Sequence, residues 1–198
     1  MVITDIKKNK GKSYSVYIDN GDTFGVSEYI LMKQDIHIGM ELSEKELDFI
    51  KNQVLISMSK SDAINFVSYK MRTAYEVEIK LKEKYPLEII QEVIDYLNQN
   101  DYLNDEMYAE RFINEKKKLG KLSKKELVYK LMEKGIKREL IEIMIEKNEY
   151  DEIGYAKKVI AKRGKTKDKK EEAKAINYLY RKGFSKDTID EIIKEKRN

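Results

Sequence analysis

The chain has 198 residues, of which 40 are Lys or Arg and 36 are Asp or Glu, so its net charge is +4. It contains no cysteine, which excludes a disulfide framework and a thiolate metal site. No apolar run approaches the roughly 18 residues of a membrane span, and the N-terminus lacks the apolar core of a signal peptide. We therefore expect a cytoplasmic protein that makes no membrane contact.

The N-terminal segment predicts β-strands. Residues 13–19 are rich in β-forming side chains, and Asn20-Gly21 is the dipeptide preferred in a two-residue type I′ hairpin turn. Residues 2–7 and 22–26 complete a three-stranded sheet, which is too thin to be stable alone. We expect the sheet to pack on a helix that starts after Ser27.

The chain beyond this sheet is predicted to be helical. Ser43 and Glu46 have the spacing of a capping box, in which each side chain satisfies a free backbone amide at the start of a helix. Leu47, Ile50 and Val54 then recur at the helical period of three to four residues. This pattern predicts a long amphipathic helix.

Three later stretches resemble one another. An Ala followed by an apolar pair three and four residues on occurs at residues 63–67, 109–113 and 156–160. A second shared block follows each stretch and contains Leu81, Leu131 or Leu179. A fixed period of this length is typical of stacked units that are each too small to bury their apolar face alone. The sequence thus predicts a mainly α-helical fold with three tandem helix-turn-helix-like repeats of three helices, in an elongated array after the small sheet.

Each middle helix of these repeats carries end signals. Capping boxes precede the first two middle helices, at Thr73–Glu76 and Ser123–Glu126, but Glu171 and Lys174 occupy those positions in the third. A Gly after the last Lys ends the second and third of these helices, where Gly supplies the left-handed conformation: Gly135 and Gly183.

These patterns divide the chain into four segments. We expect the hairpin with its helices at residues 1–57, and helical repeats at residues 58–106, 107–150 and 151–198.

Positive charge is concentrated in two blocks. Residues 115–138 hold ten Lys and Arg against three acids, and residues 156–186 hold twelve against three, whereas residues 139–153 hold one Lys against six acids. Such stripes suit docking on a polyanion or on a charged protein groove, although a solvated Lys- and Glu-rich surface is the alternative interpretation. The candidate binding residues are Arg111, Lys116, Lys117, Lys118, Lys121, Lys124, Lys125, Lys157, Lys158, Lys162, Arg163, Lys165, Lys167, Lys169 and Lys170.

No catalytic constellation is evident in the sequence. His37 is the single histidine, so a zinc site is not expected, and the glycines do not form a phosphate-binding loop. Asp101, Asp105 and Glu106 lack the ligand spacing of a calcium loop and are better explained by helix capping. We therefore expect neither enzymatic activity nor a metal or cofactor.

The segment Tyr102–Ile113, with the sequence YLNDEMYAERFI, resembles the hallmark that opens the second repeat of the RecX regulatory proteins. The resemblance continues in Arg72–Val77 and Ser123–Ile136, and the hairpin with Phe24–Ser27 is similar to an extension in many low-GC bacterial members. It spans essentially the whole chain, and it departs from the family pattern in the lysine-rich third repeat, which lacks the capping Ser or Thr.

The resemblance implies a cytoplasmic bacterial modulator of the RecA recombinase, with a role in homologous recombination, DNA repair and the SOS response. Members of this family bind the RecA–DNA filament along its groove and suppress ATP hydrolysis, strand exchange and coprotease activity. We accordingly expect a monomer whose partners are the RecA filament and single- or double-stranded DNA. The alternative is a nucleic-acid-binding helical-repeat protein that acts without RecA.

Overall fold

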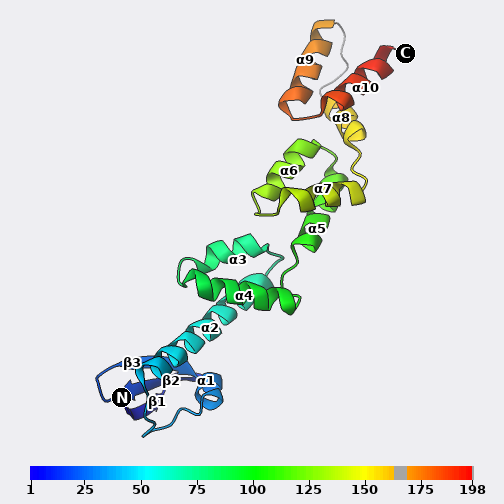
Figure 1. The fold of residues 1–198 in the computed structure, drawn as a ribbon. Coiled ribbons are helices and arrows are strands. Elements are labelled where there is room, and N and C mark those ends of the chain that lie inside the picture. The colour runs from blue at the N-terminus through cyan, green and yellow to red at the C-terminus, as the bar shows by residue number, and fades with distance from the viewer. Residues whose placement is uncertain (163–168, 198) are drawn as a thin grey trace. The chain divides into compact units, whose positions relative to one another are not determined.

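The computed structural model describes residues 1–162 and 169–197, and this part of the chain contains ten helices and three strands (Figure 1). The chain forms two compact units. The first unit comprises Met1–Lys70 and Val77–Tyr102, and the second comprises Met71–Glu76 and Leu103–Asn198. The predicted fold class, mainly α-helical with a preceding three-stranded sheet, is confirmed.

The first unit begins with an antiparallel sheet in the order β1-β2-β3. Val16 and Val26 are buried on one face of this sheet and share a hydrophobic core with Leu47 and Ile50 of the long helix α2. The bounds are β1 Ile3–Lys8, β2 Ser13–Ile18, β3 Thr23–Ser27, α1 Glu28–Lys33 and α2 Glu44–Ser68. The hydroxyl of Ser27 accepts a hydrogen bond from the Ile30 amide at 3.2 Å, so the predicted helix start is confirmed.

The turn between β2 and β3 differs from the predicted type I′ turn. Gly21 has a positive φ of 89°, but Asn20 does not, whereas a type I′ turn needs positive φ at both central residues. The amide of Ile18 donates to Asp22 O and the amide of Gly21 donates to Ile18 O, so the loop contains three residues with Gly21 in the left-handed position. The strand register therefore requires one left-handed residue, which glycine provides without steric cost.

Helix α2 contributes to two packing environments in the first unit. Its start carries the predicted capping box, in which Ser43 Oγ accepts from the Glu46 amide and the Glu46 carboxylate accepts from the Ser43 amide. Toward its other end Ala63 is fully buried, and α4 (Leu87–Gln99) packs against α2. Position 57/58, where we divided the sequence, thus lies inside a continuous helix, and the four-segment division remains a proposal.

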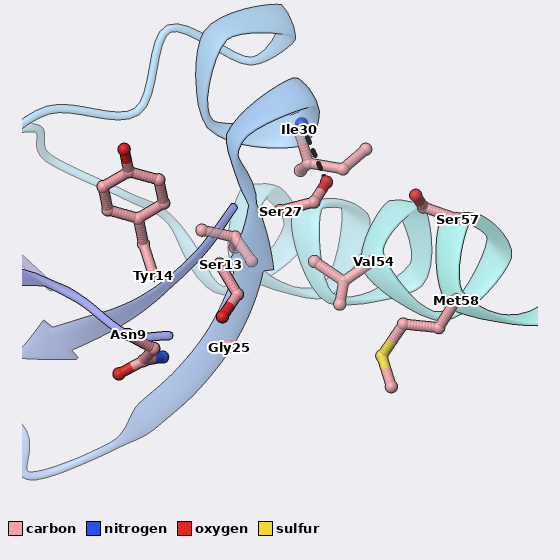
Figure 2. A pocket seen from close by; sticks show the side chains of 10 residues that line it. Asn9, Ser13, Tyr14, Gly25, Ser27, Ile30, Val54, Ser57 and Met58 are labelled. Carbon is pink, nitrogen blue, oxygen red and sulfur yellow. Dashed lines mark hydrogen bonds between the residues drawn. The ribbon is translucent and has the colours of Figure 1, made fainter. Parts of the chain in front are cut away.

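A cavity of about 290 Å³ lies between α2 and the sheet. Figure 2 shows Val54 and Met58 of α2 beside this cavity, with Gly25 of β3 across from them. No charged side chain lines it. The lining of this cavity therefore does not indicate a catalytic site.

The three predicted repeats are three sets of three helices. The first helices are α2, α5 (Asp105–Leu119) and α8 (Glu152–Ala161); the middle helices are α3 (Ala74–Leu81), α6 (Lys124–Met132) and α9 (Lys169–Arg181); the third helices are α4, α7 (Arg138–Lys147) and α10 (Lys186–Arg197). The repeat alanines and leucines all have an exposed fraction of 2% or less: Ala63, Ala109, Ala156, Leu81, Leu131 and Leu179. The predicted repeat register is therefore confirmed.

One hydrophobic core extends through α5 to α10 in the second unit. It joins Ile113 and Leu131 of the second repeat to Leu179 and Ile189 of the third in a single cluster. Neither repeat closes a core by itself, as expected for units that each have too little apolar surface to bury alone.

We predict that Leu131→Ala destabilises the protein by about 2–5 kcal/mol, because it removes buried methyl groups and leaves a cavity at a site with no solvent exposure. Urea denaturation followed by circular dichroism measures this loss. The matched control is Leu87→Ala at an exposed helix position, which should cost less than about 0.5 kcal/mol. Equal costs for the two variants would contradict the repeat register.

Candidate functional site

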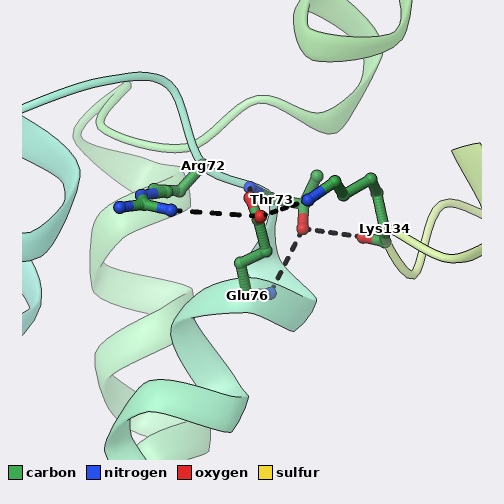
Figure 3. Close-up of polar contacts among 4 residues, drawn as sticks. All are labelled: Arg72, Thr73, Glu76 and Lys134. Carbon is green, nitrogen blue, oxygen red and sulfur yellow. Dashed lines mark hydrogen bonds and ion pairs between the residues drawn. The ribbon is translucent and has the colours of Figure 1, made fainter.

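The start of α3 contacts a distant turn through a buried hydroxyl. Thr73, which is fully buried, accepts a hydrogen bond from the Glu76 amide at 3.2 Å and donates one to the Lys134 carbonyl at 2.7 Å, 61 residues later in the chain. The Glu76 carboxylate accepts from the Thr73 amide and pairs with Lys134 Nζ at 2.8 Å (Figure 3). All of these residues belong to the second unit. A helix cap thus serves also as a tertiary contact.

The start of α6 repeats part of this arrangement: within the described residues the Ser123 amide does not donate to the Glu126 carboxylate, so the predicted capping box is only half formed, and Glu126 Oε2 is buried without a hydrogen-bond partner. Ser123 is also fully buried, accepts from the Glu126 amide at 3.1 Å, and donates to the Lys182 carbonyl at 2.7 Å. Lys182 Nζ lies 4.0 Å from the Glu126 carboxylate. We call each of these sets a cap joint: a Thr or Ser cap and its Glu against a Lys-Gly turn, Thr73–Glu76 with Lys134–Gly135 and Ser123–Glu126 with Lys182–Gly183.

A second carboxylate completes each cap joint. Asp105, at the start of α5, accepts a hydrogen bond from the Ala74 amide at 3.0 Å, and Glu152, at the start of α8, accepts one from the Lys124 amide at 2.7 Å. Glu152 is buried and also accepts from the Thr188 hydroxyl. Each carboxylate thereby satisfies a backbone amide that has no partner within its own helix.

The ionisable groups of the first cap joint have pKa values that are shifted in opposite directions. Burial raises the pKa of the Glu76 carboxyl, but the hydrogen bonds from Lys134 and Thr73 outweigh it and leave the pKa lowered. The hydrogen bond to Glu76 in turn raises the pKa of Lys134. Asp105 has a raised pKa because of burial and the nearby Glu76 charge, although the Ala74 amide opposes this shift. The joint is therefore stabilised by ionised Glu76 and Lys134.

The glycine of each Lys-Gly turn is required by its backbone and its surroundings. Gly135 and Gly183 have φ values of 77° and 80°, which confirms the predicted left-handed ends of these helical segments. A Cβ on Gly135 would lie 2.1 Å from the Cβ of Tyr75, whereas a Cβ on Gly183 would lie 3.1 Å from the Ser123 hydroxyl. The two copies therefore differ in how closely the neighbouring helix approaches.

This difference predicts unequal effects of alanine. We expect Gly135→Ala to cost more than about 2 kcal/mol of unfolding free energy, since steric overlap adds to the 1–2 kcal/mol of a left-handed alanine. Gly183→Ala should cost about 1–2 kcal/mol. Gly25→Ala is the control, because the nearest atom would be 4.0 Å away and φ is not positive, and it should not destabilise. Chemical denaturation ranks the three, and equal losses would disprove the steric argument.

We also predict a pH-dependent cost for Glu76→Gln. Because folding lowers the pKa of Glu76 below its ordinary value of 4.5, its ionised form contributes stability above that pH and loses it as the pH falls through the folded-state pKa. The variant should lose about 1 kcal/mol near neutral pH, and this deficit should shrink in acid. Denaturation of both proteins across a pH series measures the deficit, with Glu126→Gln, whose lysine is 4.0 Å away, as a weaker control. A deficit independent of pH would rule out the ion pair as its cause.

The candidate lysines of the second repeat lie at the end of α5 and the start of α6. Lys118, Lys124 and Lys125 are exposed and form no ion pair within the described part of the chain, whereas Lys117 donates to the Asn148 carbonyl. Arg111 on α5 contacts the sulfur of Met71 at 3.1 Å. Lys118, Lys124 and Lys125 therefore present positive charge that no carboxylate of the described residues neutralises.

The candidate residues of the third repeat are less uniform. Lys157 pairs with Glu195 at 2.6 Å, and Lys158 lies over the Tyr155 ring, 5.5 Å from its centroid. Lys162 follows α8 and Lys170 lies in α9, both exposed. Three candidates lie outside the described residues: Arg163, Lys165 and Lys167. The side chain of Lys169 also lies outside the described part. Whether any candidate contacts a partner stays a prediction.

A cavity of about 360 Å³ brings two candidate lysines together with residues that we did not predict. Lys116 and Lys121 share its lining with Lys130 of α6 and with Lys134 of the turn that follows α6. The remaining lining residues are Phe112, Leu119, Leu122 and Glu133. Lys130 and Lys134 are four residues apart in the sequence, a spacing that predicts a shared face of a continuous helix and could have identified them, although α6 ends before Lys134.

The described residues give no indication of a catalytic or metal site. Within residues 1–162 and 169–197, no group of three or more His, Asp or Glu side chains is placed to hold a metal ion. Asn104, rather than the acidic residues beside it, caps α5 by accepting from the Met107 amide. In the same part of the chain, no helix is long and apolar enough to cross a membrane.

Family models match all three helical repeats. The models of the first, second and third RecX three-helix domains match residues 60–97, 104–144 and 153–193. A regulatory protein RecX of Streptococcus uberis is 33% identical over 194 residues, which cover 96% of this chain and 74% of the relative. That of Caldanaerobacter subterraneus subsp. tengcongensis is 29% identical over 98% of both chains. The relative from Lacticaseibacillus paracasei matches at 34% identity over 68% of this chain, and the chain spans 56% of that relative's length.

Two solved structures have the same fold. A crystal structure of a regulatory protein RecX has a TM-score of 0.76 and 26% identity, and the match covers 98% of both chains. The structure of RecX from Lactobacillus salivarius has a TM-score of 0.63 and 30% identity over 71% of this chain and 96% of that one. The fold and the matches together define a regulatory protein built from tandem three-helix domains. The chain belongs to the RecX family.

Proposed function

We propose that this protein binds the RecA–DNA filament and lowers its ATP hydrolysis, strand exchange and coprotease activity. The proposal rests on two observations. The chain belongs to the RecX family, and the resemblance to that family implies RecA as the partner. The second repeat also carries exposed lysines. Lys118, Lys124 and Lys125 form no ion pair among the described residues, so they are available to an anionic partner. We propose further that it acts as a monomer in the cytoplasm, as the family resemblance implies.

The mechanism is a shift between filament states. A protein that binds one state of the filament more tightly than the others favours that state by the difference in binding free energy. Because the second and third repeats share one hydrophobic core, their contacts with a filament are held in a fixed geometry. Linked contacts of this kind gain avidity when both can engage at once.

The test is RecA ATPase activity on single-stranded DNA, measured with increasing amounts of the full chain. We expect the rate to fall, and we expect the triple variant Lys118→Gln, Lys124→Gln and Lys125→Gln to need a severalfold higher concentration for the same effect. The matched control removes the same charge from the hairpin of the first unit, through Lys8→Gln, Lys10→Gln and Lys12→Gln. No effect of the unmodified protein would refute the proposal, and equal losses in both variants would refute this placement of the surface.

The second candidate function is nucleic-acid binding without RecA. The same unneutralised lysines favour it, since phosphate contacts by Lys supply affinity that falls steeply with salt concentration. Fluorescence anisotropy of labelled single- and double-stranded oligonucleotides, without RecA, separates the two candidates. Tight, salt-sensitive binding together with an unchanged RecA ATPase rate would favour the second.

A further inference from the structure

The cavity of about 360 Å³ in the second unit combines an apolar floor with a basic rim. Its floor contains Phe112, Leu119 and Leu122, and Leu119 is 53% exposed although it is a large apolar residue. Interfaces between proteins commonly have an apolar centre surrounded by polar residues that exclude water. The cavity therefore has the composition of a docking site.

The charges around the cavity select an anionic occupant. Four lysines and one glutamate line it. Lys121 and Lys130 make no ion pair with any carboxylate of the described residues, and Lys116 pairs with Glu115, whose side chain is largely exposed. Because an exposed pair contributes little, an incoming carboxylate can replace Glu115 at small cost.

The apolar floor distinguishes a peptide from a nucleic acid. Tyr108 stacks beside the Phe112 ring, with centroids 6.5 Å apart and planes inclined by 12°, and Lys116 Nζ lies over the same ring, 4.7 Å from its centroid. Single-stranded bases bind chiefly by stacking on aromatic faces. Leu119 and Leu122 also line the cavity and offer no aromatic face, so they suit an apolar amino-acid side chain.

We propose that this cavity binds an acidic segment of a protein partner, in which one large apolar side chain contacts Leu119 and Leu122. Carboxylates on either side of that residue pair with Lys121 and Lys130. This inference deepens the proposed function, because it rests on the partner being a protein filament, and it states which chemistry of that partner is recognised.

The first experiment uses a fluorescent peptide with the sequence Glu-Asp-Phe-Asp-Glu and the full chain. We expect saturable binding, and we expect a peptide with Ser in place of Phe to bind at least about tenfold more weakly, because the apolar anchor is lost. Amide NMR shifts at saturation should concentrate in residues 112–134. Equal binding of the two peptides would overturn the apolar anchor, and no binding at about 1 mM would overturn the site.

The second experiment uses variants at the cavity and matched variants outside it. Leu119→Ser, and Lys121→Gln with Lys130→Gln, should each weaken binding of the Phe peptide by about tenfold. Ile143→Ser, which changes an apolar residue of similar exposure (57%) on α7, and Lys194→Gln, at an exposed position of α10 outside the cavity, should leave binding unchanged. Equal weakening by the cavity variants and these controls would overturn the assignment.

A competition experiment tests the choice of a peptide over a nucleic acid. Displacement of the Phe peptide by a ten-residue oligothymidine, with the same residues shifted in the NMR spectrum, would overturn that choice.

The RecA ATPase rate separates this inference from the proposed function. If the unmodified protein lowers the RecA ATPase rate and Leu119→Ser does so equally well, the cavity proposal fails while the proposed function stands. If the unmodified protein leaves that rate unchanged, the proposed function fails, and the peptide experiments by themselves decide what the cavity binds.

Discussion

The buried hydroxyls of Thr73 and Ser123 impose the constraint on which the helical part of the second unit depends. Each accepts a hydrogen bond from its own helix and donates one to a carbonyl about sixty residues away. A buried hydroxyl without partners costs about 1–3 kcal/mol, so both bonds are needed where the side chain has no solvent contact. The starts of α3 and α6 can therefore each lie in one place relative to the Lys-Gly turn that they contact.

This constraint explains features that appear unrelated along the chain. The turn must present its carbonyl to the hydroxyl, which requires a left-handed residue, and the neighbouring helix approaches so closely at Gly135 that a side chain does not fit. Glu76 and Asp105 then satisfy the remaining polar groups of the first cap joint. The hydrophobic core of α5 to α10 contributes burial energy, and the polar joints define the geometry in which it is buried.

Lys134 connects the cap joint to the surface that we propose for partner binding. Its carbonyl accepts from Thr73, its ammonium pairs with Glu76, and the same side chain lines the basic cavity. Among the described residues, Lys121 and Lys130 of that cavity form no ion pair, whereas Lys116 pairs with Glu115 and lies over the Phe112 ring. The proposed partner surface thus lies beside a rigid joint, which holds the binding groups in place at little further entropic cost.

The sequence by itself determined the fold class, the repeat register and the helix caps, because apolar spacing, capping boxes and Lys-Gly ends act over a few residues. Ala109 and Leu131 are buried as the register requires, and Ser43, Thr73 and Ser123 cap their helices. Local rules were insufficient for the turn at Asn20-Gly21, where strand register selected a three-residue loop. Only the tertiary structure decided that two caps also bind distant carbonyls, and that Lys130 and Lys134 share a cavity with Lys116 and Lys121. These contacts join residues far apart in the chain, and their formation depends on how helices pack rather than on any short pattern.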